Sequence, residues 1–546
     1  MPRLLGKSKH SRTVQDVCDA GSRMHDDQTD PHPPSAELAR LGAGALGRLL
    51  GAGTLTSAEV TAALLERLDA MDRSGPTLRS VLRINDRAID DASALDAERS
   101  SGHLRGPLHG IPVVVKDNVD TVGLGATAGS LALDGAPVAV DAALVTQLRS
   151  AGVIILGKTN LSEWANFRGR PSASGWSAVG NQTRNPFALN RSPGGSSSGS
   201  GAAVAAGLSP LGVGTETDGS ILCPAAACGV VGIKPTVGLV SQAGIIPISA
   251  SQDTAGPMAR SVEDAAALLD ALVSATTSAR ASTADPLGRP ARRGSYADAV
   301  SSDLRGIRVG VVRDDGYFGY HRATDDIVEW ALGAFREAGA DVVESVTGIG
   351  AAVHADEMTV LCTEFKAGLG AYLVQRFAGA GESPSQRRLP RTLDDVVAFN
   401  EATAGERLDL FPQDVLVRAA SSGRLDDPAY LAARAANHRR TREEGIDAVC
   451  VRLGLDALVA PTMAPAWMID HVNGDSHSGA SWSQAAIAGY PSLNLPIGEV
   501  HGLPVGLALW GRAFTEATLI RIASAVEGQI SYRPVPAYKP FLDVVT

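Results

Sequence analysis

The feature that most constrains this chain is a run of glycine and serine, SPGGSSSGSG, at residues 192–201. A second polar turn, GTETDGS at residues 214–220, follows after a short apolar stretch. Glycine adopts backbone conformations that other residues avoid, so both segments can bend tightly and bring side chains together. Ser196 and Ser220 are therefore candidate nucleophiles, and the chain is a candidate hydrolase if a base can deprotonate one of them.

Lysine is a better candidate for that base than histidine. The eleven histidines occupy positions without a pattern, such as His10 and His103, and none stands in a Ser/His/Asp context. Lys116 ends a continuous apolar run that begins at Ile111, which predicts a buried strand delivering its last side chain to one edge of a sheet. Because burial disfavours the ammonium form, it lowers the pKa of a lysine.

With these residues the chain resembles the amidase signature hydrolases, a family that uses a Ser, cis-Ser, Lys triad. The resemblance follows the family's order from the strand ending at Lys116 into the C-terminal part of the chain. The matching segments after that strand are GGSSSGSG, GTETDGS, Cys223–Gly229, Gly232–Thr236, Asp253–Arg260, Ala488–Pro491 and Gly502–Leu507.

The resemblance implies a role for each member of the triad. The family's nucleophile falls on Ser220, its bridging cis-serine on Ser196 and its lysine on Lys116. Neutral Lys116 would accept a proton from Ser196, which would accept one from Ser220 as that residue attacks an amide carbonyl. The family also implies a cis peptide bond between Gly195 and Ser196.

The GTETDGS turn is expected to stabilise the oxyanion through the backbone N–H groups of Thr217, Asp218, Gly219 and Ser220. The commonest family turn reads GTDxGGS; here Glu216 replaces the aspartate and Asp218 the first glycine. We expect the Asp218 side chain to point away from the developing negative charge and to fix the turn. Gly219, without a side chain, would let the substrate approach the main chain.

Several segments resemble one subgroup, the bacterial peptide amidases. These are the TETDGS turn, Ser198 in place of the usual glycine, Asn160–Phe167, Cys362–Lys366, and Ala460–Thr462 followed by Pro465–Trp467. The leading hypothesis is therefore hydrolysis of peptide C-terminal amides, with release of ammonia.

The substrate pocket is predicted from fewer signals. Trp164, Phe167 and Trp467 are candidates to line it, although aromatic residues near a sheet are more often part of the core. Ser197 is a further candidate for substrate contact, with holding the serine loop as its alternative role. Asp253 is expected to brace the backbone near the active turn rather than to carry a proton.

No cofactor or metal is expected. Cys223 and Cys228 could be taken for metal ligands, but their spacing is not CxxC and no histidine cluster accompanies them, so buried packing is the favoured interpretation. A phosphate-binding loop is a further alternative for the glycine tract, but no lysine followed by Ser or Thr comes after the glycines.

Charge and composition exclude some classes of partner. The net charge of −10 argues against nucleic acid and anionic membranes, and no apolar run reaches the ~20 residues that span a bilayer. Five scattered cysteines suit a reducing compartment, which favours the cytoplasm. Secretion is the alternative if a leader has been removed. The partner expected is a small-molecule or peptide amide, and monomer and homodimer are both open.

The predicted fold is α/β. Residues 1–35 are expected to be a disordered polar tail and 36–546 a single domain, with the catalytic signature region at about 106–260. The segment at about 357–444 is predicted to be mainly helical, and the resemblance implies that it covers the active site. The resemblance implies a large mixed β-sheet core covered on both faces by α-helices.

Two other enzymatic functions use similar motifs. An aryl acylamidase or a carbamate (urethane) hydrolase would use the same triad with a different pocket. The glutaminase subunit of a tRNA amidotransferase has a similar signature region, but the N-terminal tail and the helical segment fit that class less well.

Overall fold

The protein is described from a computed structural model, and the structure describes residues 33–273, 294–350, 354–378, 389–403, 405 and 410–542. Most of the expected N-terminal tail, residues 1–32, lies outside the described residues. Helix α2 (Pro33–Arg40) already begins inside the last three residues of that expected tail.

Eleven strands of the described residues form one mixed sheet, as the sequence predicted. Their order across the sheet is β1-β3-β2-β6-β8-β7-β12-β13-β11-β9-β10. Their bounds are β1 Val81–Ile84, β2 Pro112–Lys116, β3 Ile154–Thr159, β6 Leu211–Glu216, β7 Val231–Lys234, β8 Thr254–Ala259, β9 Arg308–Val312, β10 Asp341–Val346, β11 Ala457–Pro461, β12 Ser492–Val500 and β13 Leu503–Trp510. A separate hairpin pairs β4 (Trp176–Ser177) with β5 (Asn181–Gln182).

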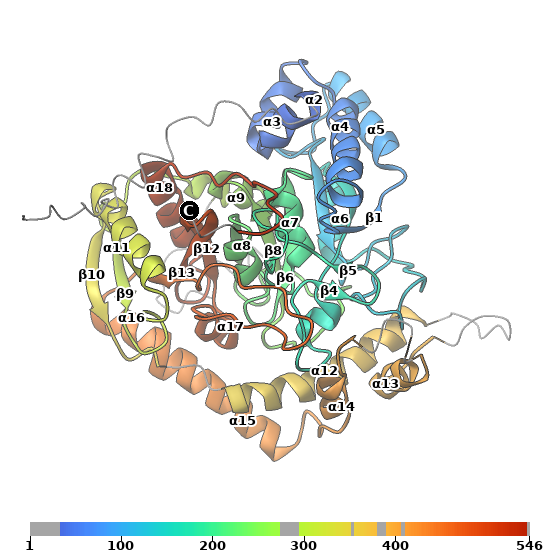
Figure 1. Cartoon of the computed structure of the whole chain (residues 1–546). Helices are drawn as coiled ribbons and strands as arrows, with labels where there is room; N and C mark the ends of the chain where they lie inside the picture. The colour runs from blue at the N-terminus through green and yellow to red at the C-terminus, as the bar shows by residue number, and fades with distance from the viewer. Residues whose placement is uncertain are drawn as a thin grey trace, which may run out of the picture.

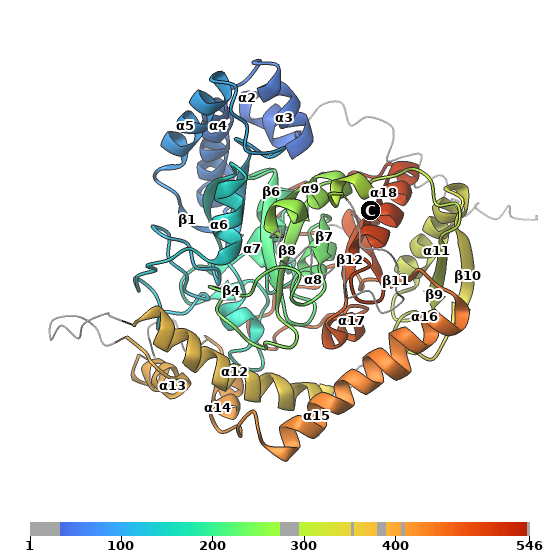
Figure 2. The same cartoon turned by 180° about the vertical axis from the view of Figure 1, so that it is seen from behind.

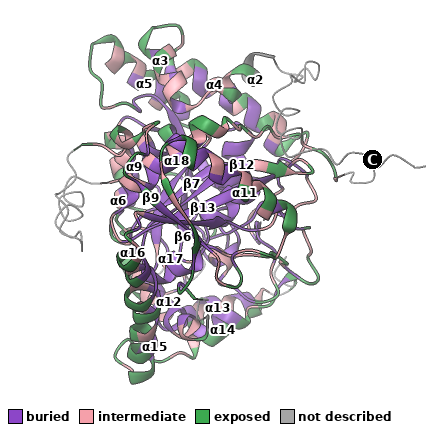
Figure 3. Cartoon of the chain, turned by 90° about the vertical axis from the view of Figure 1, so that its left-hand side faces the viewer, coloured by how far each residue is buried: buried purple, intermediate pink, exposed green. Residues whose placement is uncertain are grey.

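Helices cover both faces of the sheet, and alternation along the strands gives each face its own hydrophobic core (Figures 1 and 2). In β11, Ala457 and Val459 belong to one core, whereas Leu458 and Ala460 belong to the other. The first core contains residues of α6 (Ala143–Ser150), α9 (Val262–Leu272), α11 (Arg322–Glu337) and α18 (Glu516–Ile530). The second contains residues of α7 (Ser198–Ala205), α8 (Leu222–Ala227), α16 (Asp447–Leu453) and α17 (Ser483–Ala488). Figure 3 shows the sheet buried between these layers.

The sheet's topology places the candidate catalytic segments together. Strands β2 and β6 are neighbours and run parallel, so their carboxyl ends meet at the same edge. Lys116 is the last residue of β2, and the GTETDGS turn forms the end of β6 and the loop after it. β2 is buried along its whole length, which fits the unbroken apolar run that predicted it.

The C-terminal half supplies the predicted helical segment. Its described helices are α12 His354–Arg376, α13 Leu393–Ala402, α14 Asp414–Ala420, α15 Pro428–His438 and η5 Arg439–Ile446. In Figures 1 and 2, α12 and α15 run along the lower side of the molecule, below the sheet. Residues 379–388, 404 and 406–409 of this segment lie outside the described residues. None of the helices in the described ranges is both long and apolar enough to cross a membrane.

The N-terminal helices pack beside the first half of the sheet. They are α3 Ala43–Gly51, α4 Ser57–Leu68, η1 Asp69–Arg73 and α5 Ala88–Ser100, and α4 begins with a capping box formed by Thr56 and Glu59. The cap of α3 comes instead from α9: Asp264 accepts hydrogen bonds from Ala43 N at 3.0 Å and Gly44 N at 2.8 Å. The remaining short elements are η2 Glu163–Asn166 and η3 Ala297–Ala299.

This long-range cap predicts a stability change. Asp264→Ala leaves two backbone N–H groups of α3 without an acceptor, which should lower the free energy of unfolding by about 1–3 kcal/mol. The exposed neighbour Glu263 is the control, and Glu263→Ala should cost less than about 1 kcal/mol. Urea unfolding followed by circular dichroism measures both, and equal losses would contradict the capping role of Asp264.

Candidate functional site

Lys116 forms the centre of the candidate site. Its Nζ atom lies 2.7 Å from Ser196 Oγ, 3.0 Å from Thr215 O and 2.9 Å from Thr215 Oγ1, and its side chain is fully buried. Asn118 Nδ2 also donates to Thr215 Oγ1, at 2.9 Å. The structure therefore brings together Lys116 and Ser196, which are 80 residues apart in the sequence.

Burial lowers the pKa of Lys116 to about 7, while the nearby Asp253 and Glu216 carboxylates act in the opposite direction. A substantial fraction of the amine is therefore uncharged at neutral pH. The two Thr215 oxygens can accept the two N–H bonds of a neutral amine. The nitrogen lone pair is then available to the Ser196 hydroxyl.

The serine tract enters the site through the expected cis peptide between Gly195 and Ser196. A side chain at Gly195 would clash, because its Cβ would lie 2.4 Å from Ser162 Oγ and 2.7 Å from Ser174 Oγ. The main chain after the cis bond meets the second candidate serine, where Ser197 N donates to Ser220 O at 3.1 Å. Ser196 and Ser220 thus lie on adjoining segments, both buried.

Glu216 organises the turn that carries Ser220. Its Oε2 atom accepts from Ile221 N at 2.7 Å and from Leu222 N at 3.0 Å, and the Gly219 N–H also faces this carboxylate. Burial raises the pKa of Glu216, whereas Lys234 and these N–H groups lower it.

Gly219 is required for a reason that the sequence did not reveal. Its φ is +78°, and a Cβ there would lie 2.3 Å from Trp482 Nε1. The Trp482 indole occupies the space that a Cβ at position 219 would take, and approach of a substrate to the main chain here stays a prediction. A side chain at position 219 would displace this tryptophan from the wall of the site.

The acidic residues near the turn have defined hydrogen-bond partners. Asp253 accepts from Thr217 Oγ1 at 2.6 Å and from Ile248 N and Ser249 N at 2.8 and 2.9 Å, so it braces two segments. Burial raises its pKa to about 6. Asp218 is oriented toward α17, where its Oδ2 atom accepts from Ser483 Oγ at 3.1 Å.

The four candidate substrate-binding residues all have structural partners. Ser197 Oγ donates to Thr215 O at 3.0 Å and accepts from Thr215 N at 3.1 Å, which corresponds to the loop-holding alternative. Trp164 and Phe167 pack on Phe365 of α12, with ring centroids 6.2 and 5.0 Å apart. Trp467 Nε1 donates to an Asp475 carboxylate oxygen at 2.9 Å. Contact of these four side chains with substrate stays a prediction.

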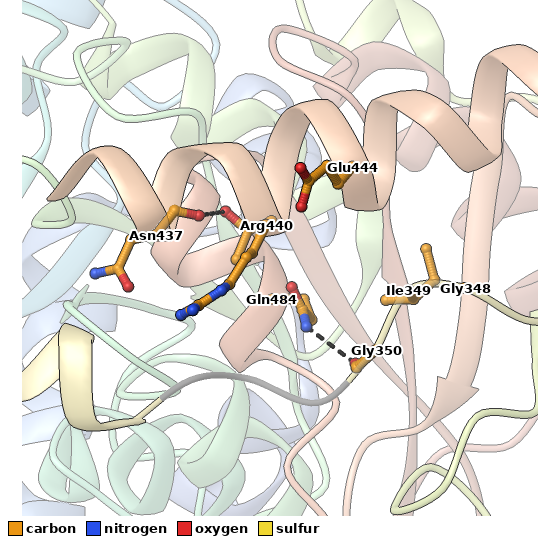
Figure 4. A pocket seen from close by; sticks show the side chains of 8 residues that line it. Gly348, Ile349, Gly350, Asn437, Arg440, Glu444 and Gln484 are labelled. Atoms are coloured by element: carbon orange, nitrogen blue, oxygen red, sulfur yellow. Dashed lines mark hydrogen bonds between the residues drawn. The ribbon is translucent and has the colours of Figure 1, made fainter. Parts of the chain in front are cut away.

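The sequence analysis did not identify a second group of aromatic rings, which is formed by Trp467, His477 and Trp482. His477 lies between Trp467 and Trp482, with ring centroids 5.4 and 6.0 Å away. Gln484, two residues after Trp482, lines a hollow of about 280 Å³ between η5 and the Gly348–Gly350 loop, where its Nε2 donates to Gly350 O at 2.9 Å (Figure 4). No motif around Trp482 marks it as a neighbour of the turn at Gly219.

Among the described residues, Cys223 and Cys228 do not gather with other metal-binding side chains. Cys223 and Cys228 are buried in the second hydrophobic core, and the Cys228 thiol faces Pro193 O at 3.4 Å. Within the described ranges, no group of three or more His, Cys, Asp or Glu side chains could hold a metal ion.

Comparison with known proteins agrees with this geometry. The model of the amidase family matches residues 59–520. A probable amidase of Arabidopsis thaliana is 36% identical over 490 residues, 86% of this chain and 87% of the relative. A glutamyl-tRNA(Gln) amidotransferase subunit from Salinispora arenicola is 35% identical over 523 residues, 92% of this chain and 99% of the relative.

Among solved structures, the native peptide amidase from Stenotrophomonas maltophilia is similar to this chain, with a TM-score of 0.84 and 47% sequence identity. The alignment covers 92% of this chain and 99% of that one. A family match over most of the sequence and agreement across the whole fold make this chain an amide-hydrolysing enzyme of the amidase signature family.

Proposed function

We propose that the protein hydrolyses the C-terminal amides of peptides by a Ser220, Ser196, Lys116 triad, without a cofactor, and releases ammonia. The observation that carries this proposal is the buried Lys116 Nζ, 2.7 Å from Ser196 Oγ and otherwise engaged only with Thr215 in the contacts described above. An amine held in this way has one function left for its lone pair, which is to take a proton from the serine.

In the first half of the reaction Ser220 Oγ attacks the amide carbonyl carbon. The Ser220 proton passes to Ser196 Oγ, and the Ser196 proton passes to Lys116 Nζ. The same protons then return through Ser196 to the leaving nitrogen as the C–N bond breaks. Because the nitrogen has gained this proton, it leaves as neutral ammonia. The acyl group stays on Ser220 as an ester.

In the second half, water attacks the acyl ester. Its proton follows the same path to Lys116 and returns to Ser220 Oγ as the ester bond breaks. The products are a free carboxylic acid and ammonia, so one amide and one water are consumed. The N–H groups of Thr217, Asp218, Gly219 and Ser220 are the proposed donors to the oxyanion.

Peptide amides are favoured over the other substrate classes by similarity along the whole chain. The solved peptide amidase is 47% identical, whereas the amidotransferase subunit is 35% identical over a comparable length. The second candidate is therefore glutaminase activity of that subunit's type. Anilides and carbamates are alternatives that the same triad could hydrolyse.

Substitution of each triad residue tests the mechanism. Ser220→Ala, Ser196→Ala and Lys116→Met should each lower kcat/KM for an amidated peptide by at least about a thousandfold, because each interrupts proton transfer or removes the nucleophile. Released ammonia is the readout. Ser198→Ala is the matched control in the same tract, because Ser198 Oγ donates to Gly194 O and has no part in the relay.

The substrate class is tested with the same enzyme. We expect faster turnover of an amidated peptide than of an anilide, a carbamate or free glutamine. A preference for the anilide would replace the proposed substrate with the acylamidase alternative. Full activity of the Ser220→Ala variant would contradict the proposed triad mechanism.

The pKa of Lys116 predicts the acid side of the pH profile. Below about 7 the amine is protonated and cannot accept a proton, so kcat should fall with decreasing pH and reach a plateau above that value. Stopped assays across the pH range with an amidated peptide measure this limb. An acid limb centred near the pKa of an unperturbed carboxylate, about 4, would exclude Lys116 as the base.

A further inference from the structure

Two carboxyl groups meet beside the nucleophile turn. Asp218 lies between Thr217 and Gly219, two residues before Ser220, and its side chain faces Glu357 on α12. Ser483 Oγ donates to Asp218 Oδ2 at 3.1 Å, and Gln252 Nε2 donates to Glu357 Oε1 at 3.0 Å. Gln252 Nε2 also lies 3.3 Å from Thr217 O, so it links the turn to α12.

The arrangement leaves one oxygen atom unexplained. Asp218 Oδ1 is buried and has no hydrogen-bond partner among the described residues. A buried carboxylate oxygen without a donor is costly, and a second carboxyl group alongside raises that cost. One proton held between the two carboxyl groups would satisfy the oxygen and remove one of the two charges.

Within the described ranges, the charges that act on Asp218 are mainly acidic, and the cation Lys234 acts more strongly on other carboxylates. Glu216 on β6 is acidic and raises the pKa of Asp218 further, as does Glu357. Lys234 on β7 interacts more strongly with Glu216 and Glu516 than with Asp218. The loop before β8 contributes uncharged Gln252 and the acidic Asp253, and α17 contributes uncharged Ser483.

We infer that Asp218 and Glu357 share a single proton and act as a positioning pair, which joins the oxyanion turn to α12 and keeps a second negative charge away from the developing oxyanion. The inference rests on the proposed function. Glycine at this position in the commonest family turn brings no charge to the turn. This chain keeps a carboxyl group there and removes its charge with a partner from a helix 139 residues later in the sequence.

The pair predicts an alkaline limb in the pH profile. Burial and the neighbouring carboxylates raise the pKa of Asp218 well above its usual value, so the shared proton is lost only as pH rises through this raised pKa. Wild-type kcat should then fall on the alkaline side. In Asp218→Asn the carboxamide donates to Glu357 without titrating, so the alkaline limb should disappear while the acid limb of Lys116 remains.

Substitution of Asp218 and substitution of Glu357 should have different effects on kcat. Asp218→Asn keeps the turn uncharged, so its loss of kcat at neutral pH should be smaller than the loss in Glu357→Gln. Glu357→Gln removes the group that holds the proton on Asp218 and offers an N–H that favours the Asp218 anion, so kcat should fall about tenfold. A merely structural contact would not produce this order together with the loss of the alkaline limb.

Glu364→Gln is the matched control, since Glu364 is a buried acid on the same helix whose partners are Ser249, Ser251 and Tyr430. It should keep the wild-type alkaline limb. Infrared absorption of a protonated carboxylic acid at neutral pH provides a second measurement that needs no activity. The band should be lost in Asp218→Asn and in Glu357→Gln and kept in Glu364→Gln, with circular dichroism confirming that each variant is folded.

The results separate this inference from the proposed function. A wild-type enzyme that hydrolyses none of the amides contradicts the proposed function, while the infrared band still decides whether the pair holds a proton. An Asp218→Asn enzyme with the same alkaline limb and the same band as wild type would overturn the shared proton.

Discussion

The rest of the site depends on how Thr215 holds Lys116. A buried lysine is costly in either protonation state unless its N–H groups find acceptors. Thr215 supplies two, its carbonyl and its hydroxyl, from the end of β6, and the parallel neighbour β2 delivers Lys116 to the same edge. Ser197 then fixes Thr215 from the other side by bonding both its N–H and its carbonyl. The strand pairing, the serine tract and Lys116 thus form one connected hydrogen-bond network.

Local patterns predicted much of this arrangement, but they could not choose among the buried lysines. Lys158 near the end of β3 and Lys234 at the end of β7 are also fully buried, and burial lowers the pKa of each to about 8. The register between β2 and β3 distinguishes Lys158 from Lys116. Lys116 pairs with Thr159, so Lys158, one residue earlier, points to the opposite face, where it donates to Val119 O and Gly125 O. The family resemblance identified Lys116 where strand-end position alone could not.

The sequence also could not reveal contacts made by distant segments. Trp482 and Ser483 approach the turn from more than 260 residues away, and no local pattern marks either residue as its neighbour. The requirement for glycine at position 219 was therefore attributed to substrate approach, whereas the structure assigns that space to an indole ring. The bracing by Asp253 was easier to anticipate, because a carboxylate before β8 lies beside the antiparallel β6 and hence near the turn.

The negative charge of each acidic residue around the turn needs its own compensating groups. Asp253 and Glu216 both act to raise the pKa of Lys116, against the larger effect of burial. Glu216 is compensated by three N–H groups and by Lys234, and Asp253 by a threonine hydroxyl and two N–H groups. A further ionised carboxylate at position 218 would favour the ammonium form of the base and oppose the charge that develops on the substrate oxygen. Both effects slow the same reaction, so a mechanism that relies on a neutral lysine also requires an uncharged turn.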